Sequence, residues 1–124
     1  MDTKRPVNLD LFQFKFPPMA ILSITHRISG VVLFLWIPFF LYILHCSVDS
    51  PLTYIVLQHA LQGFWMRLAL WIGLSAVFFH LLSGIRHMAM DLGFWESVTE
   101  SRWSAYATFV LGLVVILLLV VWIW

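Results

Sequence analysis

The residues most capable of chemistry stand in an otherwise apolar run, 78–91, with the sequence FFHLLSGIRHMAMD. The run carries two histidines, His80 and His87, and it places Gly84 and Arg86 between them. A histidine inside an apolar helix can be a ligand to a metal ion, a proton relay or a counter-ion. It can also simply form a hydrogen bond with a neighbouring helix. The residue pattern alone leaves these alternatives open.

The composition is that of a membrane protein. Of the 124 residues, 62% are hydrophobic and 10% are charged, whereas soluble domains have charges at about a quarter of their positions. The net charge of +1 and the pI near 8.0 provide no basic surplus for a phosphate backbone, so we expect no nucleic-acid partner. Cys46 is the only cysteine, so the chain alone forms neither a disulfide nor a cysteine metal cage.

Three stretches without Asp, Glu, Lys or Arg are long enough to cross a bilayer, which needs roughly 20 helical residues. These stretches are residues 28–46, 68–85 and 103–124. With their helical ends, the predicted spans are approximately 22–46, 66–90 and 103–124. The sequence therefore predicts an all-α membrane protein with three transmembrane helices, which form one domain over residues 1–124.

Basic residues predict the orientation, because Lys and Arg favour the cytoplasmic side of a membrane. The segment leading into the first span contains Lys4, Arg5, Lys15 and Arg27. Arg86 and Arg102 flank the second connection, whereas the first connection has only Arg67. We therefore expect a cytoplasmic N-terminus and a cytoplasmic 86–102 connection, with the 47–66 connection and the C-terminus outside.

Turn and capping signals delimit the predicted helices. Pro17 and Pro18 predict a turn, with the first helix beginning near Pro18. The sequence SVDSPLTY, residues 47–54, indicates a turn-like connection. SVTE, residues 97–100, matches a capping box that can open the third helix. Because that helix has no ionisable group after Arg102, we expect it to be a structural span.

Two of the predicted helices carry polar faces. Residues at helical spacing share one face of the second helix: Gly73, Ala76, His80, Ser83, Gly84 and His87. A matching set follows the first helix: Ser23, His26, Arg27 and Gly30. At about 1.5 Å per residue, His80 lies about 9 Å from the flanking Arg86, on the cytoplasmic half of the membrane. The two faces therefore predict one shared site near the cytoplasmic surface.

Haem suits these residues well. Neutral imidazole is a good axial ligand, so His80 is a candidate, and a glycine-lined face accommodates a flat macrocycle. Arg27, His26 or His87 can form charge-assisted hydrogen bonds with haem propionates. Because His80 and His87 belong to one helix, they lie on the same side of a flat ring and cannot sandwich it. A six-coordinate iron therefore needs its other ligand from elsewhere, most simply from a partner chain.

Three segments of this chain resemble a known family. RPVNLDL at 5–11, SITHRISG at 23–30 and HLLSGIRHMAMDLG at 80–93 are similar to the cytochrome b556 subunits of succinate dehydrogenase, the larger of two membrane anchors in respiratory complex II. The resemblance covers nearly the whole chain. It implies a membrane-anchor domain in the bacterial inner membrane that packs with a second, smaller anchor subunit. It also implies an iron–sulfur subunit and a flavoprotein subunit, which carry out the succinate chemistry, so this chain alone is not expected to oxidise succinate.

The resemblance also implies roles for individual residues. His80 matches the axial ligand of haem b, with the second ligand supplied by a histidine of the smaller anchor. Ser23 and Arg27 match positions that line the ubiquinone site, and His26 and His87 match positions near the haem propionates. Arg27 remains a further candidate for a propionate contact.

Two other functions stay open at this point. The chain could be the anchor of a fumarate reductase, which runs the reaction in the opposite direction. It could instead be a small transporter or proton-conducting bundle that uses His80 and His87 as a relay. Asp91 is either a solvated charge at a helix end, an acceptor for the His87 imidazole or part of a proton path.

Overall fold

A computed structural model describes residues 15–124, and these residues form helices and short connections without a strand. The helices are α1 (Pro18–Asp49), α2 (Pro51–Leu61), α3 (Phe64–Asp91) and α4 (Val98–Ile123). Three of them, α1, α3 and α4, are long and apolar enough to cross a membrane. The predicted class, an all-α protein with three transmembrane helices, is confirmed. RPVNLDL, together with Lys4 and Arg5, lies outside the described residues.

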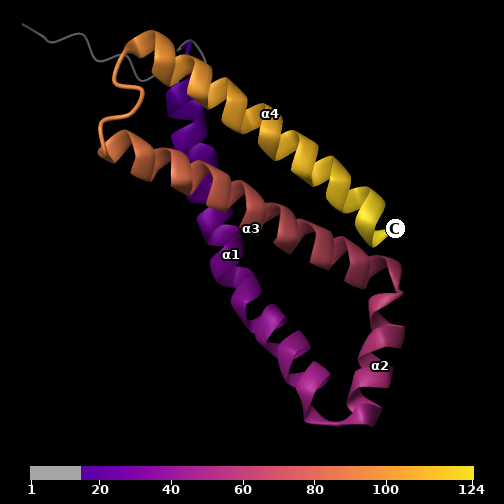
Figure 1. Cartoon of the computed structure of the whole chain (residues 1–124). Helices are drawn as coiled ribbons and strands as arrows, with labels where there is room; N and C mark the ends of the chain where they lie inside the picture. The colour runs from indigo at the N-terminus through magenta and orange to yellow at the C-terminus, as the bar shows by residue number, and fades with distance from the viewer. Residues whose placement is uncertain (1–14) are drawn as a thin grey trace, which may run out of the picture.

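Helix α3 is the central element of the fold. Figure 1 shows α1 crossing α3 obliquely while α4 runs alongside α3, and α1 also contacts α4. From the crossing, α1 and α3 diverge toward the end at which α2 connects them (Figure 1). The residues at this crossing are therefore the ones that α1 and α3 can share.

Two glycines on α3 and α4 allow the helices to approach closely, as small residues commonly do in membranes. A Cβ atom at Gly73 would lie 2.7 Å from Phe40 Cζ and would also collide with the Trp36 ring. A Cβ atom at Gly112 would lie 2.9 Å from Phe79 Cδ2. Large side chains of a neighbouring helix therefore occupy the space that these glycines leave.

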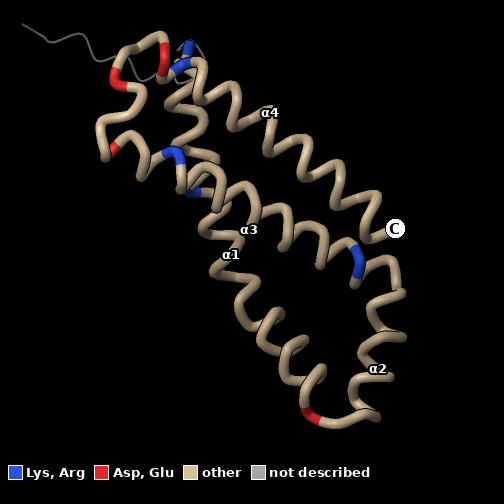
Figure 2. The backbone as a smooth tube through the Cα atoms, in the orientation of Figure 1, with Lys and Arg blue, Asp and Glu red and all other residues tan. Residues whose placement is uncertain are grey.

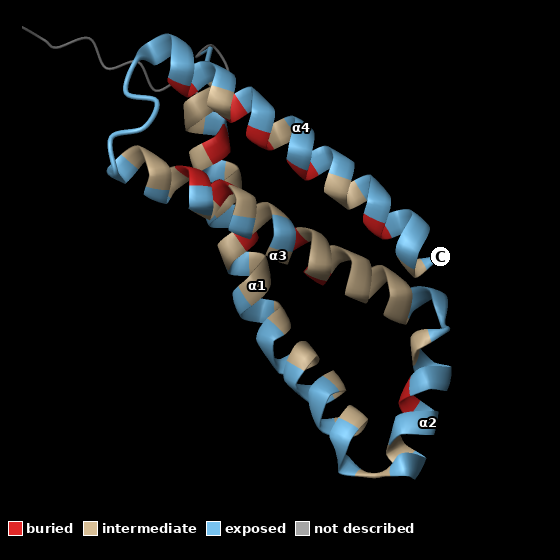
Figure 3. Cartoon of the chain, viewed as in Figure 1, coloured by how far each residue is buried: buried red, intermediate tan, exposed pale blue. Residues whose placement is uncertain are grey.

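Among the described residues, most large apolar side chains lie on the outer surface, and few residues are buried (Figure 3). The buried residues of α3 and α4 are mostly small or polar, and they include Ser83, Ser101 and Ala105. A soluble domain would bury its large apolar residues, whereas a membrane protein exposes them to lipid or to other subunits. This inverted distribution agrees with the hydropathy of the three long helices.

The first connection differs from its prediction, because residues 51–61 form a helix where a turn-like link was expected. Ser50 caps this helix: its hydroxyl accepts from the Thr53 backbone N–H at 3.2 Å, and Thr53 Oγ1 accepts from the Ser50 N–H at 3.0 Å. Pro51 occupies the first position, where a missing N–H costs nothing. The sequence S-P-x-T therefore contained a start signal for α2.

The start of α4 agrees with the prediction from SVTE. The Ser97 hydroxyl accepts from the Glu100 backbone N–H at 3.2 Å, which satisfies one free donor of the first turn. Before it, the connection from α3 turns through Gly93, whose φ of 89° suits glycine. Charged residues gather at this end of the molecule, with a few others at the opposite end (Figure 2). The orientation of the chain in the membrane stays a prediction.

Candidate functional site

The crossing of α1 and α3 brings together part of the two predicted polar faces, namely the histidines and glycines but not Ser23 and Arg27. His26 of α1 lies between His80 and His87 of α3, and the three imidazole rings form a stack. The ring centroids of His26 and His80 are 4.1 Å apart, and those of His26 and His87 are 4.9 Å apart. The planes deviate from parallel by 17° and 20°. Three of the five candidate residues are therefore in one cluster.

His80 is held by α1 through one of its ring nitrogens. Its Nδ1 lies 3.0 Å from Ser29 Oγ and 3.2 Å from the backbone oxygen of His26. The Ser29 hydroxyl in turn donates to the same His26 oxygen at 2.7 Å. Within the described part of the chain, the other ring nitrogen of His80, Nε2, has no hydrogen bond. The imidazole is thus fixed at one nitrogen and available at the other.

His87 is fixed by its own helix. Its Nδ1 lies 2.7 Å from the backbone oxygen of Ser83, one turn earlier. A carbonyl oxygen only accepts, so Nδ1 carries the proton and donates it. Asp91, a candidate acceptor for this imidazole, is exposed, and no hydrogen bond joins the two side chains in the described region.

The glycines of the site contact imidazoles. A Cβ atom at Gly30 would lie 3.2 Å from His80 Cε1, which is tighter than an ordinary contact. A Cβ atom at Gly84 would lie 3.6 Å from His26 Nε2, an ordinary van der Waals distance. The expectation was that these glycines leave room for a flat macrocycle. In this chain, each borders a histidine of the opposite helix.

Two polar atoms at the crossing are buried without a partner in the described chain, His26 Nε2 and Ser83 Oγ. Buried polar groups in proteins nearly always have a hydrogen-bond partner, so each exception requires an explanation. His26 Nε2 belongs to the histidine stack, and Ser83 lies one turn before His87 on α3. A group with acceptor oxygens, such as a carboxylate, would satisfy a protonated Nε2 or the hydroxyl. The residues at this crossing therefore fit a cofactor that presents an anionic group.

The predicted quinone residues are placed differently from the histidines. Arg27 is exposed and Ser23 is half-buried, and the side chains of both lack a hydrogen bond or ion pair to any described residue. Each successive residue of a helix is rotated by about 100°, so Arg27 faces well away from the direction of His26. The histidine cluster and the Ser23–Arg27 pair thus occupy neighbouring faces of α1.

Sequence reasoning missed the role of Ser29, although Ser29 stands in the SITHRISG segment. It is 7% exposed and provides the side-chain contact to His80. Its position three residues after His26 was the available signal, since residues at that spacing share a helix face.

Arg86 also has an unexpected environment. It was interpreted only as a charge flanking the membrane, but its residue is 5% exposed and it contacts α4. Its Nη2 donates to the Ser101 backbone oxygen at 2.9 Å and to Ser101 Oγ at 3.1 Å, and its Nε donates to Ser104 Oγ at 2.9 Å. Helix α4 therefore holds the C-terminal end of α3 through these hydrogen bonds.

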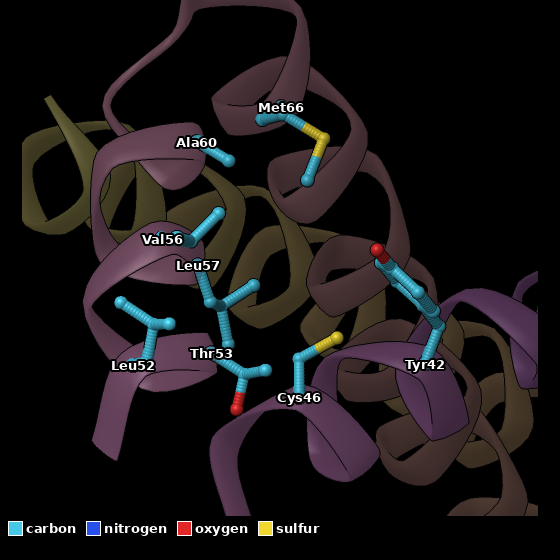
Figure 4. Close-up of a pocket in the computed structure, with 8 residues that line it drawn as sticks. All are labelled: Tyr42, Cys46, Leu52, Thr53, Val56, Leu57, Ala60 and Met66. Atoms are coloured by element: carbon cyan, nitrogen blue, oxygen red, sulfur yellow. The ribbon is translucent and has the colours of Figure 1, made fainter. Parts of the chain in front are cut away.

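A separate cavity of about 470 Å³ lies between α1, α2 and α3. Figure 4 shows the side chains that line it: Tyr42, Cys46, Leu52, Thr53, Val56, Leu57, Ala60 and Met66. At about 1.5 Å per residue, Tyr42 lies about 24 Å along α1 from His26. The cavity is therefore remote from the histidine cluster, and its lining carries no formally charged group.

The chain is similar to known proteins over its full length. The family described as succinate dehydrogenase/fumarate reductase transmembrane subunit matches residues 1–121. The succinate dehydrogenase cytochrome b556 subunit of Coxiella burnetii is 59% identical over 125 residues, with 100% of each chain covered. The cytochrome b560 subunit of Reclinomonas americana is 30% identical over 128 residues, covering 99% of this chain and 88% of the relative. The cytochrome b556 subunit of Paracoccus denitrificans is 29% identical over 104 residues, covering 83% of this chain and 79% of the relative.

Proposed function

Because the chain belongs to the succinate dehydrogenase/fumarate reductase transmembrane subunit family, we propose that it binds haem b and forms part of a ubiquinone-reducing site. The coarser assignment follows from its relatives: it is a multi-pass membrane anchor of complex II in the inner membrane. Its partners are the flavoprotein, the iron–sulfur protein and a second anchor subunit, with lipid around the spans. Succinate is oxidised in the soluble subunits, and this chain contributes to the acceptor side.

His80 is the proposed axial ligand of haem b, which supplies one-electron redox chemistry when it is bound. The observation that carries this proposal is the state of the His80 ring: Nδ1 is engaged by α1, whereas Nε2 has no hydrogen bond to the described residues. Neutral imidazole binds haem iron through such a free nitrogen. The relatives that are named cytochrome b subunits support the same cofactor.

His26 and His87 are the proposed propionate contacts, with Arg27 as a further candidate. His26 supports this role because its Nε2 is buried and unpartnered. His87 supports it because Nδ1 is bound to the Ser83 oxygen, which leaves Nε2 for another group. Hydrogen bonds to a carboxylate are stronger than those between neutral groups, so propionates would stabilise this crossing.

The second axial ligand is proposed to come from the smaller anchor subunit. The histidines of the cluster are stacked face to face at 4.1 Å and 4.9 Å, which is an arrangement that cannot place an iron atom between two opposed nitrogens. A shared haem at the interface between the two anchors meets this condition.

Ser23 and Arg27 are the proposed contacts of the ubiquinone head group. They lie one turn apart on α1, so a hydroxyl and a guanidinium can reach one ligand. The hydroxyl can donate to a quinone carbonyl, and the cation stabilises negative charge as the ring is reduced. The free guanidinium of Arg27 supports this role, because it is not committed to another described residue. Both residues are at the end of the molecule that is predicted to face the soluble iron–sulfur subunit.

The haem assignment is tested with the purified complex carrying His80→Ala. We expect the b-type band of the reduced-minus-oxidised absorbance spectrum to disappear, while the flavoprotein and iron–sulfur subunits still co-purify. His59→Ala on α2, whose residue is exposed, is the matched control and should retain the band. A full b-type band in an assembled His80→Ala complex would contradict the assignment.

An anchor of a fumarate reductase remains the second candidate, because the family description includes both enzymes. The two are distinguished by comparing succinate:quinone and quinol:fumarate rates of the purified complex. The proton-conducting bundle has no support among the relatives described above, all of which are named succinate dehydrogenase subunits.

A further inference from the structure

We propose that Ser29 is a positioning residue that, together with the His26 backbone carbonyl, fixes the tautomer and the ring orientation of His80. The proposal rests on the proposed function, in which His80 binds haem iron, and it goes beyond that function by naming the group that prepares the ligand. Its basis is the contact between Ser29 Oγ and His80 Nδ1 at 3.0 Å.

The positions of the oxygens determine where the imidazole proton lies. His80 Nδ1 has two oxygen neighbours, Ser29 Oγ at 3.0 Å and the His26 backbone oxygen at 3.2 Å. The carbonyl oxygen can only accept, so an unprotonated Nδ1 would direct its lone pair at the lone pairs of that oxygen. A protonated Nδ1 donates toward both oxygens, and this arrangement is the favourable one.

The hydroxyl proton of Ser29 is already committed, which completes the assignment. Ser29 Oγ lies 2.7 Å from the His26 backbone oxygen, and only the hydroxyl can be the donor in that bond. The remaining lone pairs of Ser29 Oγ are then free to accept from His80 Nδ1. Every donor in this small network has an acceptor if the His80 proton is on Nδ1, so the Nε2 lone pair is left for a metal.

The surroundings hold the ring in this orientation. Gly30 borders the Nδ1–Cε1 edge, since a Cβ atom there would lie 3.2 Å from His80 Cε1. The His26 ring covers one face at a centroid distance of 4.1 Å. The His80 ring is therefore confined by Gly30 at one edge and by His26 on one face. The Ser29 hydroxyl adds a hydrogen-bond acceptor for Nδ1 at that edge.

A hydrogen bond from the outer nitrogen of a metal-bound histidine orients the ring and raises the basicity of the ligand. Loss of such a partner typically lowers metal affinity by about 10–100-fold. The same affinity loss is expected for haem when the Ser29 hydroxyl is removed. The His26 carbonyl remains as one acceptor, so the effect should lie near the lower limit, about tenfold.

The test uses the assembled complex with Ser29→Ala and Ser29→Thr. The readouts are the rate of haem transfer to an excess of apomyoglobin and the low-spin EPR signal of the oxidised haem. We expect Ser29→Ala to release haem about tenfold faster and to shift the EPR signal, whereas Ser29→Thr, which keeps the hydroxyl, should restore both. Ser47→Ala is the matched control, because Ser47 Oγ donates to the Leu44 backbone oxygen at the same 2.7 Å but at the far end of α1.

The outcomes separate this proposal from the proposed function. If Ser29→Ala keeps the wild-type release rate and EPR signal while His80→Ala loses haem, the role of Ser29 is wrong and the haem assignment stands. If His80→Ala retains haem, the haem assignment itself fails. Should Ser29→Ala not assemble, Ser29→Cys decides, because it keeps the shape with a weaker acceptor: faster haem release supports the proposal, and an unchanged rate overturns it.

Discussion

At the scale of single residues, the site is a set of histidines whose nitrogens have distinct roles. The Nδ1 atoms of His80 and His87 are bound to oxygens of the protein, which leaves the Nε2 atoms for other groups. Ser23 and Arg27 are not part of this network, and they project from a neighbouring face of α1. Haem chemistry would therefore depend mainly on His26, His80 and His87, and quinone chemistry on Ser23 and Arg27, with Arg27 the one candidate for both.

This separation predicts that the quinone residues can be changed without losing the haem. We expect Arg27→Leu to lower succinate:ubiquinone reductase activity by about 10–100-fold, because it removes a charged hydrogen bond of about 1.5–3 kcal/mol. Ser23→Ala should lower the activity by about 3–10-fold, since a neutral hydrogen bond contributes about 0.5–1.5 kcal/mol.

The measurement compares quinone reduction with succinate oxidation by a soluble artificial acceptor, which should persist in both variants. Arg67→Leu, at the start of α3, is the control: it also removes a positive charge, but at the opposite end of the molecule. Wild-type quinone turnover in assembled Ser23→Ala and Arg27→Leu complexes would refute the proposed quinone site.

At the scale of helices, polar contacts and small residues determine how the spans pack. Trp36 Nε1 donates to the Ala69 backbone oxygen at 2.9 Å, and this bond joins α1 to α3 beside Gly73. Trp71 Nε1 donates to the Ile116 backbone oxygen at 3.2 Å and joins α3 to α4. Because lipid is as apolar as these helices, such specific contacts have to provide the association that the hydrophobic effect provides in water.

Arg86 provides the most extensive polar contact between α3 and α4, so it should stabilise their packing. We expect Arg86→Leu to reduce stability by about 1–3 kcal/mol, which would appear as a lower Tm of the detergent-solubilised complex. Arg102→Leu, at an exposed position of α4, should leave the Tm close to that of the wild type.

A double-mutant cycle of Arg86→Leu with Ser104→Ala tests the contact itself, because coupled residues give non-additive losses. Strictly additive losses would show that the hydrogen bond from Arg86 Nε to Ser104 Oγ makes no contribution of its own.

The helices themselves were largely predictable from the sequence, because long runs without charge have few alternatives to a membrane span. The meeting of the two polar faces was also predictable, since helical spacing identifies His26, His80 and His87 as inward-facing. The contact of Arg86 with Ser101 and Ser104 was not predictable, because serines on an apolar helix do not indicate which neighbour they contact. Helix α2 was missed because its capping signal lay in a segment interpreted only as a turn.

At the scale of the whole molecule, the exposed surface of the chain is that of one subunit in a larger membrane assembly. Its outer surface is rich in large apolar side chains (Figure 3), and α1 diverges from α3 beyond their crossing (Figure 1). Lipid and the second anchor subunit are the proposed occupants of these surfaces. The predicted orientation rests on Lys and Arg, of which Arg86 and Arg102 flank the second connection whereas the first has only Arg67 (Figure 2).

The orientation is testable by labelling single cysteines, since Cys46 is the only one in the sequence. In a Cys46→Ser background, Glu96→Cys in the connection after α3 should react with a membrane-impermeant maleimide only in inside-out vesicles. Leu52→Cys on α2, a position that is 70% exposed, should react only in right-side-out vesicles. The reverse pattern would place the N-terminus outside and contradict the positive-inside assignment.

The unpartnered nitrogen of His26 and the unpartnered hydroxyl of Ser83 connect the stability of the folded subunit to the binding of a cofactor. A ligand that supplied a hydrogen-bond partner to either atom would stabilise the folded chain, because only that state holds the two atoms at the helix crossing. A ligand that binds the native state alone stabilises it in proportion to the logarithm of its concentration. The supply of cofactor in the cell would then govern how much of this subunit survives proteolysis, before any electron is transferred.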